Sequence, residues 1–284
     1  MSSIVFLNGD FCKEEDAKVS IFDRGYLFGD GIYEVVPVIN GKVIDKEPFF
    51  ERFEGSMSKI GLKAPFCKTE IITILDTLIA KNEIVEGGIY MQVTRGVAPR
   101  EFYFPENTPT TFMAFTFKKE IIHHPLAEKG IKVVSCEDIR WKRRDIKSIS
   151  LLGQVLAKEE VHHKGAFEGW MVEDGFVTEG TSSAAFIIKN GVIITRPLSH
   201  AILPSIRRKV LMELTHTHGI KVEERLFSIE EALNADEAFM ASATVFLLPI
   251  IEIDGKPIGN GKPGEMVKKL RALYVEAALK EANA

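Results

Sequence analysis

The stretch EDIRWKRRDIKSISLLG, residues 137–153, gathers five cationic side chains and then becomes apolar. A lysine amine is a nucleophile only in its uncharged form, which desolvation and neighbouring cations both favour. Lys147 is therefore a candidate nucleophile, and a solvated surface lysine is the alternative. The five cations are Arg140, Lys142, Arg143, Arg144 and Lys147.

Composition narrows the possible partners. The 284 residues carry 36 Lys and Arg against 40 Asp and Glu, a formal net charge of -4, which favours neither nucleic acid nor an anionic membrane. Three cysteines without a C-x-x-C pair indicate a reducing compartment and no zinc cluster, and the histidine pairs lack a third ligand. With no leader-like start and no run near ~18 apolar residues, we expect a cytoplasmic chain without metal, membrane or nucleic acid.

The first half of the chain reads as two hairpins, two helices and two strands. The turn at Asn40-Gly41 is typical of a two-residue hairpin. Apolar residues at helical spacing predict a helix over 48–62, and Thr69 is the expected cap of a second helix. GIYMQVTRG and TTFMAFTFKKE are rich in strand-forming residues.

The second half contains further strands and helices. A charged segment near 120–126 separates two similar halves, so we expect a two-domain α+β protein. The predicted parts are an N-terminal α/β domain over 1–119, a linker over 120–126 and a C-terminal α+β domain over 127–284. The elements expected in the last are a strand at 131–134, a helix at 151–164, a three-stranded meander within 170–196, a helix at 205–218, a Ser228–Glu231 capping box, one strand within 237–255 and a helix from Gly264.

Two short segments could bind an anion or a planar ligand. In LPSIRRKV, residues 203–210, a helix starting at Ser205 would offer free amides at Ser205, Ile206 and Arg207. An ordinary helix cap is the alternative. In VTEGTSSAAF, residues 177–186, small residues allow close approach to the backbone beside Glu179, although a plain loop has the same composition.

A third segment, VTRGVAPREFYFPENT, could bind a carboxylate. Arg95 and Arg100 flank a Gly/Pro loop, and guanidinium binds carboxylate bidentately. A surface loop is the alternative. The aromatic residues Phe102, Tyr103 and Phe104 would be unusual on an uncovered surface, which suggests that another subunit covers them.

The order of these segments resembles the fold-type IV aminotransferases that depend on pyridoxal phosphate, and within them the bacterial D-amino acid transaminases. The resemblance spans nearly the whole chain and implies a two-domain α+β fold with the cofactor at the domain interface, in the C-terminal cofactor-binding domain. The segments that carry it are DRGYLFGDGIYEVV (23–36), YMQVTRGVAPREFYFPENT (90–108), EDIRWKRRDIKSISLLGQVLAKEE (137–160), VTEGTSSAAF (177–186) and IIEIDGK (250–256).

The resemblance also implies roles for individual residues. Lys147 would be the catalytic lysine that links to the cofactor and then moves the substrate proton, with its cationic neighbours keeping the amine neutral. Glu179 would face the pyridine nitrogen, and Arg52 would bind the phosphate. The remaining cofactor-binding residues would be Leu203, Ser205, Ile206, Arg207, Ser242, Ala243 and Thr244, with Ala243 at the place of a phosphate-loop threonine.

The substrate site implied by the resemblance comprises Tyr33, Arg100, Phe102 and Ser182. Tyr33 and Arg100 would bind the α-carboxylate, with Arg100 supplied by the partner subunit of a homodimer that shares its active sites. The D-specific pattern has a histidine two residues after that arginine. This chain has Phe102 there, which cannot donate a hydrogen bond to a carboxylate.

The implied reaction is transamination between a D-amino acid and a 2-oxo acid, for example D-alanine with 2-oxoglutarate giving pyruvate and D-glutamate, by a ping-pong mechanism. Branched-chain L-amino acid aminotransferases and aminodeoxychorismate lyases share the fold and are the alternatives. A binding protein that kept the fold but lost the chemistry would be expected to lack the lysine or its carboxylate, and both Lys147 and Glu179 are present.

Overall fold

A computed structural model describes residues 3–284, which divide into two compact units. Unit 1 comprises the chain up to Lys119, Ile146–Ser150 and Ala278–Ala284; unit 2 comprises Glu120–Asp145 and Leu151–Ala277. The domain bounds expected from sequence remain a prediction. The units differ from them chiefly in that the segment of Lys147 belongs with the N-terminal part of the chain.

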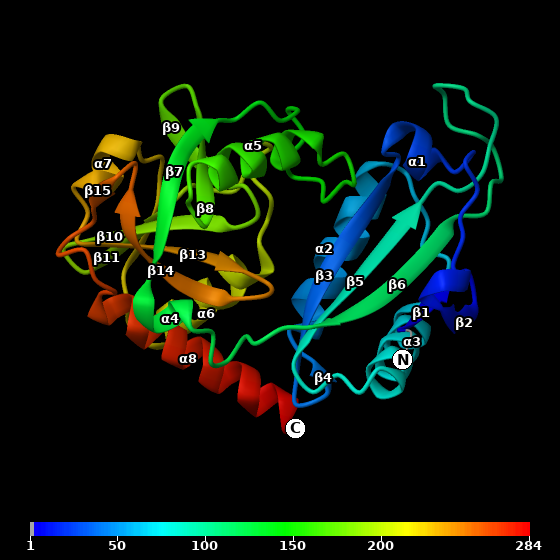
Figure 1. Ribbon diagram of the computed structural model, residues 1–284, viewed down its shortest axis with the longest axis horizontal. Helices are drawn as coiled ribbons and strands as arrows, with labels where there is room; N and C mark the ends of the chain where they lie inside the picture. Colours follow the sequence, from blue (N-terminus) through cyan, green and yellow to red (C-terminus); the bar gives the residue numbers. More distant parts are fainter. Residues whose placement is uncertain (1–2) are drawn as a thin grey trace. The chain divides into compact units, whose positions relative to one another are not determined.

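Unit 1 is built on a sheet with the strand order β2-β1-β6-β5-β3-β4 (Figure 1). Neighbouring strands pair antiparallel throughout. Helices α2 and α3 pack against it. The elements are β1 (Ile4–Leu7), β2 (Asp10–Lys13), η1 (Glu14–Asp16), α1 (Arg24–Phe28), β3 (Gly31–Ile39), β4 (Lys42–Val43), α2 (Lys46–Lys59), α3 (Lys68–Lys81), β5 (Gly87–Thr94) and β6 (Thr111–Lys118).

Alternation along the strands of unit 1 gives its sheet one buried face. On β3, Ile32, Glu34 and Val36 are fully buried, whereas Tyr33 and Val35 between them are half-buried. Because successive side chains of a strand point to opposite faces, the two sets lie on opposite sides of the sheet. The buried face is the one on which α2 lies, since Arg52 of α2 reaches Glu34.

Local signals in unit 1 agree with most of the sequence prediction. The β3–β4 hairpin turns at Asn40 and Gly41, whose φ angles of 50° and 71° are left-handed, as such a turn requires. The expected cap at Thr69 is wrong. Helix α3 is capped by Cys67, whose amide donates to the Glu70 carboxylate at 2.7 Å. The helix therefore begins one residue before Thr69.

Unit 2 contains a nine-stranded sheet among the described residues, in the order β12-β11-β10-β13-β14-β7-β8-β9 with β15 beside β14 (Figure 1). Helices α4, α5 and α6 pack against its strands. The elements are α4 (Leu126–Lys129), β7 (Ile131–Glu137), α5 (Leu152–His163), β8 (Glu168–Glu173), β9 (Phe176–Gly180), β10 (Ala184–Lys189), β11 (Val192–Thr195), α6 (Ile206–Thr217), β12 (Val222–Glu224), α7 (Ile229–Leu233), β13 (Glu237–Ser242), β14 (Phe246–Ile253), β15 (Lys256–Pro257) and α8 (Glu265–Ala282).

Two strand predictions for unit 2 are wrong. The expected meander is two hairpins, β8–β9 and β10–β11, with β13, β14 and β7 lying between them in the sheet. The segment expected as one strand within 237–255 is two, because the chain turns after Ser242 and Phe246 takes a left-handed φ of 55°. Both errors concern long-range pairing, which local patterns do not encode. Within residues 3–284, no helix is long and apolar enough to span a membrane.

Candidate active site

The segment around Lys147 extends the sheet of unit 1 along β3. The Tyr33 amide donates to the Lys147 carbonyl at 2.9 Å, the Ile149 amide donates to the Gly31 carbonyl at 3.1 Å, and Ser148 is bridged to Ile32. The Lys147 amide itself donates to Ser56 Oγ of α2 at 3.2 Å. Three hydrogen bonds of the backbone therefore hold the lysine in a defined place, which a freely solvated surface lysine would not need.

The Lys147 ammonium group lies over an aromatic ring. Its Nζ is 4.0 Å from the centroid of Tyr33, on the face of the sheet opposite α2. Tyr33 stacks on Tyr90 at 5.5 Å, and Tyr90 stacks on Phe115 at 5.0 Å. Three adjacent strands thus supply a row of rings, which holds Tyr33 rigidly beneath the lysine. Burial raises the pKa of the Tyr90 hydroxyl, which donates to Gln92 at 2.8 Å.

Arg52, the expected phosphate ligand, forms a bidentate ion pair with Glu34. Its Nε and Nη2 lie 2.8 and 2.6 Å from the two carboxylate oxygens, and Glu34 is fully buried. Sequence reasoning did not anticipate this pair. The pair orients the guanidinium, and the expected contact of Arg52 with a phosphate stays a prediction.

The loop that carries Arg100 is exposed. Phe102 is 79% exposed, and the Arg100 guanidinium lies 5.5 and 5.6 Å from the rings of Phe28 and Phe102. Arg95 is used differently: it binds Asp30 bidentately at 2.8 and 3.0 Å. Only Arg100 of the two arginines therefore remains a candidate for binding an external carboxylate.

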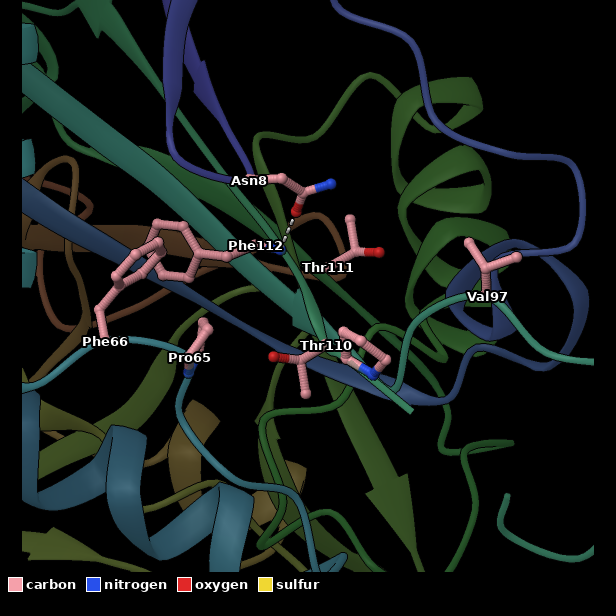
Figure 2. Close-up of a pocket in the computed structure, with 8 residues that line it drawn as sticks. Asn8, Pro65, Phe66, Val97, Thr110, Thr111 and Phe112 are labelled. Carbon is pink, nitrogen blue, oxygen red and sulfur yellow. Dashed lines mark hydrogen bonds between the residues drawn. The ribbon is translucent and has the colours of Figure 1, made fainter. Parts of the chain in front are cut away.

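A pocket of about 360 Å³ also lies in unit 1, lined by Asn8, Phe66 and Thr111 among others (Figure 2). The Asn8 side chain accepts from the Phe112 amide at 2.9 Å, and the Thr111 hydroxyl donates to Asp23 at 2.6 Å. Both polar groups thus serve the fold. None of the site residues expected from sequence lines this pocket.

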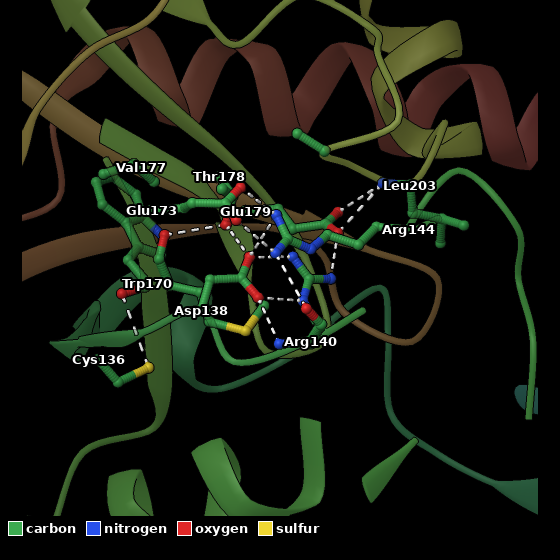
Figure 3. A network of polar contacts seen from close by, with 12 residues as sticks. Cys136, Asp138, Arg140, Arg144, Trp170, Glu173, Val177, Thr178, Glu179 and Leu203 are labelled. Carbon is green, nitrogen blue, oxygen red and sulfur yellow. Dashed lines mark hydrogen bonds and ion pairs between the residues drawn. The ribbon is translucent and has the colours of Figure 1, made fainter. Parts of the chain in front are cut away.

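In unit 2, Glu179 is the end of a buried chain of charges (Figure 3). Arg140 Nη1 donates to Glu179 Oε1 at 2.5 Å, and the other side of the guanidinium binds Asp138 at 2.9 and 2.7 Å. Asp138 also accepts from the Thr178 hydroxyl at 2.6 Å. The Leu203 amide lies 3.2 Å from both oxygens of Glu179. Within the described chain, Oε2 of Glu179 has only this amide as a hydrogen-bond donor.

A β-bulge directs Glu179 into this network. In the β8–β9 pair, Trp170 faces Gly180 and Val172 faces Val177, so Thr178 and Glu179 together oppose the single residue Met171. A bulge re-aims side chains and is common beside active sites. Here it lets two consecutive residues serve one network, with Thr178 bonded to Asp138 and Glu179 to Arg140.

The charges in the network influence one another. Burial raises the pKa of Glu179, and the charge and hydrogen bond of Arg140 oppose that rise, as does the Leu203 amide. Burial also acts to raise the pKa of Asp138, but the hydrogen bonds and charge of Arg140 outweigh it and hold the pKa below its ordinary value. Arg140 is thus the group that opposes protonation of both carboxylates.

The other cations of the opening stretch have carboxylate partners too. Arg144 donates to Glu173 at 2.7 and 3.1 Å, and Lys142 is bonded to the same carboxylate. Arg143 donates to Asp145 at 3.0 and 3.2 Å. The neighbouring cations of the run therefore form ion pairs with carboxylates, whereas the sequence suggested a cluster of unpaired cations beside Lys147.

Replacing Glu173 by Gln should give a pH-dependent loss of stability. Hydrogen bonds from Arg144, then from Lys142, lower the pKa of Glu173 from 4.5 to about 2. A carboxylate with a depressed folded-state pKa stabilises the protein above its unfolded-state value and loses that effect as the pH falls through the folded-state value. We expect Glu173→Gln to unfold about 1–3 kcal/mol more easily at pH 7. The difference should shrink between pH 4.5 and about 2.

Denaturant unfolding at a series of pH values measures this difference. Glu265→Gln is the matched control, because the Glu265 side chain is 89% exposed and pairs with Lys268 one helical turn away. That change should cost less than about 0.5 kcal/mol at any pH. A Glu173→Gln deficit that persisted at pH 2 would contradict the assignment.

The start of α6 is a well-formed helix N-terminus. Ser205 is the cap, with its hydroxyl accepting from the Arg208 amide at 3.3 Å, and Ile206 and Arg207 in the first turn are buried. The amides of a first helical turn have no partner within the helix and form a site for anions. A second expected segment, Ser242, Ala243 and Thr244, is half-buried in the turn between β13 and β14.

The expected substrate role of Ser182 stays a prediction, and its hydroxyl has a partner within unit 2. Its hydroxyl donates to Glu168 at 3.0 Å. Arg140, Asp138, Glu34 and Glu168 were all missed by sequence reasoning. The only local signal was the spacing of Asp138 and Arg140, two residues apart, which also occurs in ordinary surface segments.

Comparisons with known proteins show what the chain is similar to. Residues 31–253 match the family model described as amino-transferase class IV. The chain is 42% identical over 270 residues to a D-alanine aminotransferase of Staphylococcus epidermidis, covering 94% of this chain and 95% of that one. It is 37% identical to a D-alanine aminotransferase of Bacillus licheniformis, covering 98% of each.

Solved structures show the same fold. A branched-chain amino acid aminotransferase of Escherichia coli superimposes with a TM-score of 0.92 at 23% identity, covering 99% of this chain and 96% of that one. At such low identity the likeness concerns the fold alone. The match to the family model covers most of the residues, and the curated relatives extend it to nearly the full length. The chain therefore belongs to the class IV aminotransferases.

Proposed function

We propose that this protein transfers the amino group of a D-amino acid, such as D-alanine or D-glutamate, to a 2-oxo acid by a ping-pong mechanism. The observation that carries the proposal is the similarity of more than nine-tenths of the chain to D-alanine aminotransferases. We further propose a cytoplasmic homodimer. Free thiols at all three cysteines suit a reducing compartment, and the exposed aromatic loop at Phe102 suits a covered surface.

The donor chemistry of the chain fits pyridoxal 5′-phosphate, the cofactor of this family. Lys147 supplies a primary amine, Glu179 supplies a carboxylate with one lightly bonded oxygen, and the first turn of α6 supplies amides for a phosphate. Arg52 would add a guanidinium. When bound, the cofactor carries the amino group and withdraws electrons from the substrate Cα. The half-buried segment Ser242–Thr244 would complete the phosphate site.

Each site residue has a separate task in this proposal. Lys147 Nζ takes the proton from the substrate Cα, and the backbone bonds of its segment keep that nitrogen over Tyr33. Glu179 would face the ring nitrogen of the bound cofactor and supply a carboxylate to it. Arg140 binds the opposite oxygen and opposes protonation of this carboxylate, which as an anion would stabilise positive charge at the ring. Leu203 contributes its amide to the same carboxylate.

Tyr33 and Arg100 would bind the substrate α-carboxylate, with Arg100 supplied by the partner subunit. Arg100 lies on an exposed loop, and within residues 3–284 its guanidinium contacts the rings of Phe28 and Phe102, which suits binding to a second subunit or a ligand. Phe102 would contribute apolar contact where a hydrogen-bond donor is typical of the D-specific pattern.

The visible spectrum of the purified holoenzyme tests the proposal. D-alanine should convert the bound cofactor to its amine form, and a 2-oxo acid should restore the original spectrum. Conversion by L-leucine but not by D-alanine would instead favour a branched-chain L-amino acid aminotransferase. That activity is the alternative because position 102 is Phe, whereas the D-specific pattern has a histidine there. Release of pyruvate without an oxo acid acceptor would indicate a lyase. A spectrum that no amino acid changed would refute transamination.

Replacing Phe102 by His should strengthen binding of the amino donor. A histidine could donate a hydrogen bond to the substrate carboxylate, and bonds to charged groups contribute about 1.5–3 kcal/mol. We expect KM for D-alanine to fall about tenfold, with kcat changed less. Tyr103→His is the matched control, since Tyr103 is a neighbouring aromatic with 72% exposure. Equal effects of the two changes would mean that position 102 does not face the substrate.

A further inference from the structure

One buried carboxylate in unit 2 has no part in the mechanism above. Glu168, the first residue of β8, is completely buried. Its Oε2 accepts from the hydroxyls of Ser182 and Ser183 at 3.0 Å each. Its Oε1 accepts from Lys158 Nζ at 3.2 Å, from the Gly169 amide at 2.9 Å and from the Thr181 hydroxyl. Five donors therefore surround this single side chain.

Three of the five donors belong to one short turn, Gly180–Ser183, which follows Glu179 directly. The Gly180 amide donates to the Ser183 carbonyl at 2.7 Å, and the Thr181 amide donates to the Gly169 carbonyl at 2.9 Å. A Cβ at Gly180 would collide with Ser183 Oγ. The turn therefore has an internal hydrogen bond and is also bonded to β8 through its backbone and its side chains. These bonds hold the turn in a single conformation.

The strand itself does not require this carboxylate. β8 is held by backbone pairing with β7 and β9, and Glu168 pairs with Val133 through the backbone. Burying a charge costs several kcal/mol, and well-packed apolar residues usually replace buried ion pairs without loss of stability. The contacts that offset this cost are concentrated on the turn. The contacts of Glu168 therefore order the turn rather than the core.

We propose that Glu168 is a positioning residue that holds the Gly180–Ser183 turn in the geometry needed to bind the amino acid substrate. Ser182 then acts through the placement of its backbone, since its hydroxyl is directed to Glu168. The same anchoring fixes the chain immediately after Glu179 and so the end of β9. The substrate part of this inference rests on the proposed function, whereas the order of the turn does not.

Glu168→Gln tests the proposal, because it keeps the shape and removes the charge. In the holoenzyme we expect KM for the amino donor to rise about tenfold, with kcat lowered less. Hydrogen exchange at the Gly180 and Thr181 amides should accelerate to a similar degree. Glu168→Asp, which retains the charge, should recover part of both effects.

Glu237→Gln is the matched control. Glu237 also opens a strand, and its carboxylate accepts from the Met266 and Val267 amides of α8 at 3.0 and 2.9 Å. That change should lower the melting temperature but leave KM and the exchange of Gly180 and Thr181 unaltered. A Glu168→Gln protein indistinguishable from the control in both readouts would overturn the proposal.

A second variant covers the case in which Glu168→Gln does not fold. Lys158→Met removes the counter-charge from a half-exposed position and should raise KM and speed exchange in the same direction, by a smaller factor. No change in either readout would count against the proposal. If the wild-type protein transaminated nothing, the exchange data would still decide whether Glu168 orders the turn, so the two proposals can fail separately.

Discussion

Lys147→Ala should lose transaminase activity by about 10³-fold or more, because general acid–base catalysis alone contributes about 10²–10⁴-fold and the amine would also be lost as a nucleophile. The backbone bonds to Tyr33, Gly31 and Ser56 do not involve the side chain, so the segment should keep its place on β3. Activity is measured with D-alanine and 2-oxoglutarate, and the visible spectrum should lose the contribution of the lysine-linked cofactor.

Lys142→Ala is the control for this change. Lys142 lies in the same cationic run, and its side chain is 81% exposed and paired with Glu173. The variant should retain activity within about twofold, because exposed ion pairs contribute little. If Lys147→Ala kept more than about a tenth of the wild-type rate, another group would have to move the substrate proton, and the assignment of Lys147 would fail.

Glu179→Gln should lower kcat by about 10²–10³-fold, the loss typical when one preorganised electrostatic contact is removed. Gln keeps the shape and can still accept from Arg140 and Leu203, but it no longer carries the charge that stabilises a protonated ring nitrogen. The effect should fall mainly on kcat rather than on KM, because the charge matters most when electrons flow into the ring.

Glu173→Gln serves as the comparison for Glu179→Gln. It also neutralises a carboxylate bound by an arginine of the opening stretch, Arg144. Glu173→Gln should reduce stability and leave kcat within about threefold of the wild-type value. Glu179→Gln should lower kcat and change the stability little. Equal losses of kcat in the two variants would indicate that the whole ion-pair network supports activity only by maintaining the fold.

Local features of the molecule were predictable because their causes are local. The Asn40-Gly41 turn, the Ser205 cap of α6 and the hydrophobic stripe of α2 each depend on residues within a few positions of one another. The family of the protein could also be predicted from the sequence, because several short segments in a fixed order identify a family better than any one of them.

The arrangement of the strands was not predictable in the same way. The two hairpins β8–β9 and β10–β11 lie at separate positions in one sheet, because β13, β14 and β7 return from elsewhere in the chain to fill the space between them. Nothing in the alternation of apolar residues specifies which strand becomes the neighbour of which. The order follows from the burial of all the apolar faces together.

The sequence by itself determined the longer helices, the Asn40-Gly41 turn, the α+β class and the residues that resemble a class IV aminotransferase site. Tertiary structure alone decided their surroundings: Arg140 reaches Glu179 across 39 positions of sequence, and Lys147 meets Tyr33 across more than a hundred. Such contacts depend on the bulge in β9 and on the pairing of the Lys147 segment with β3. Long-range packing sets both, and it also pairs the cations that the sequence suggested would crowd Lys147 with carboxylates such as Glu179 and Glu173.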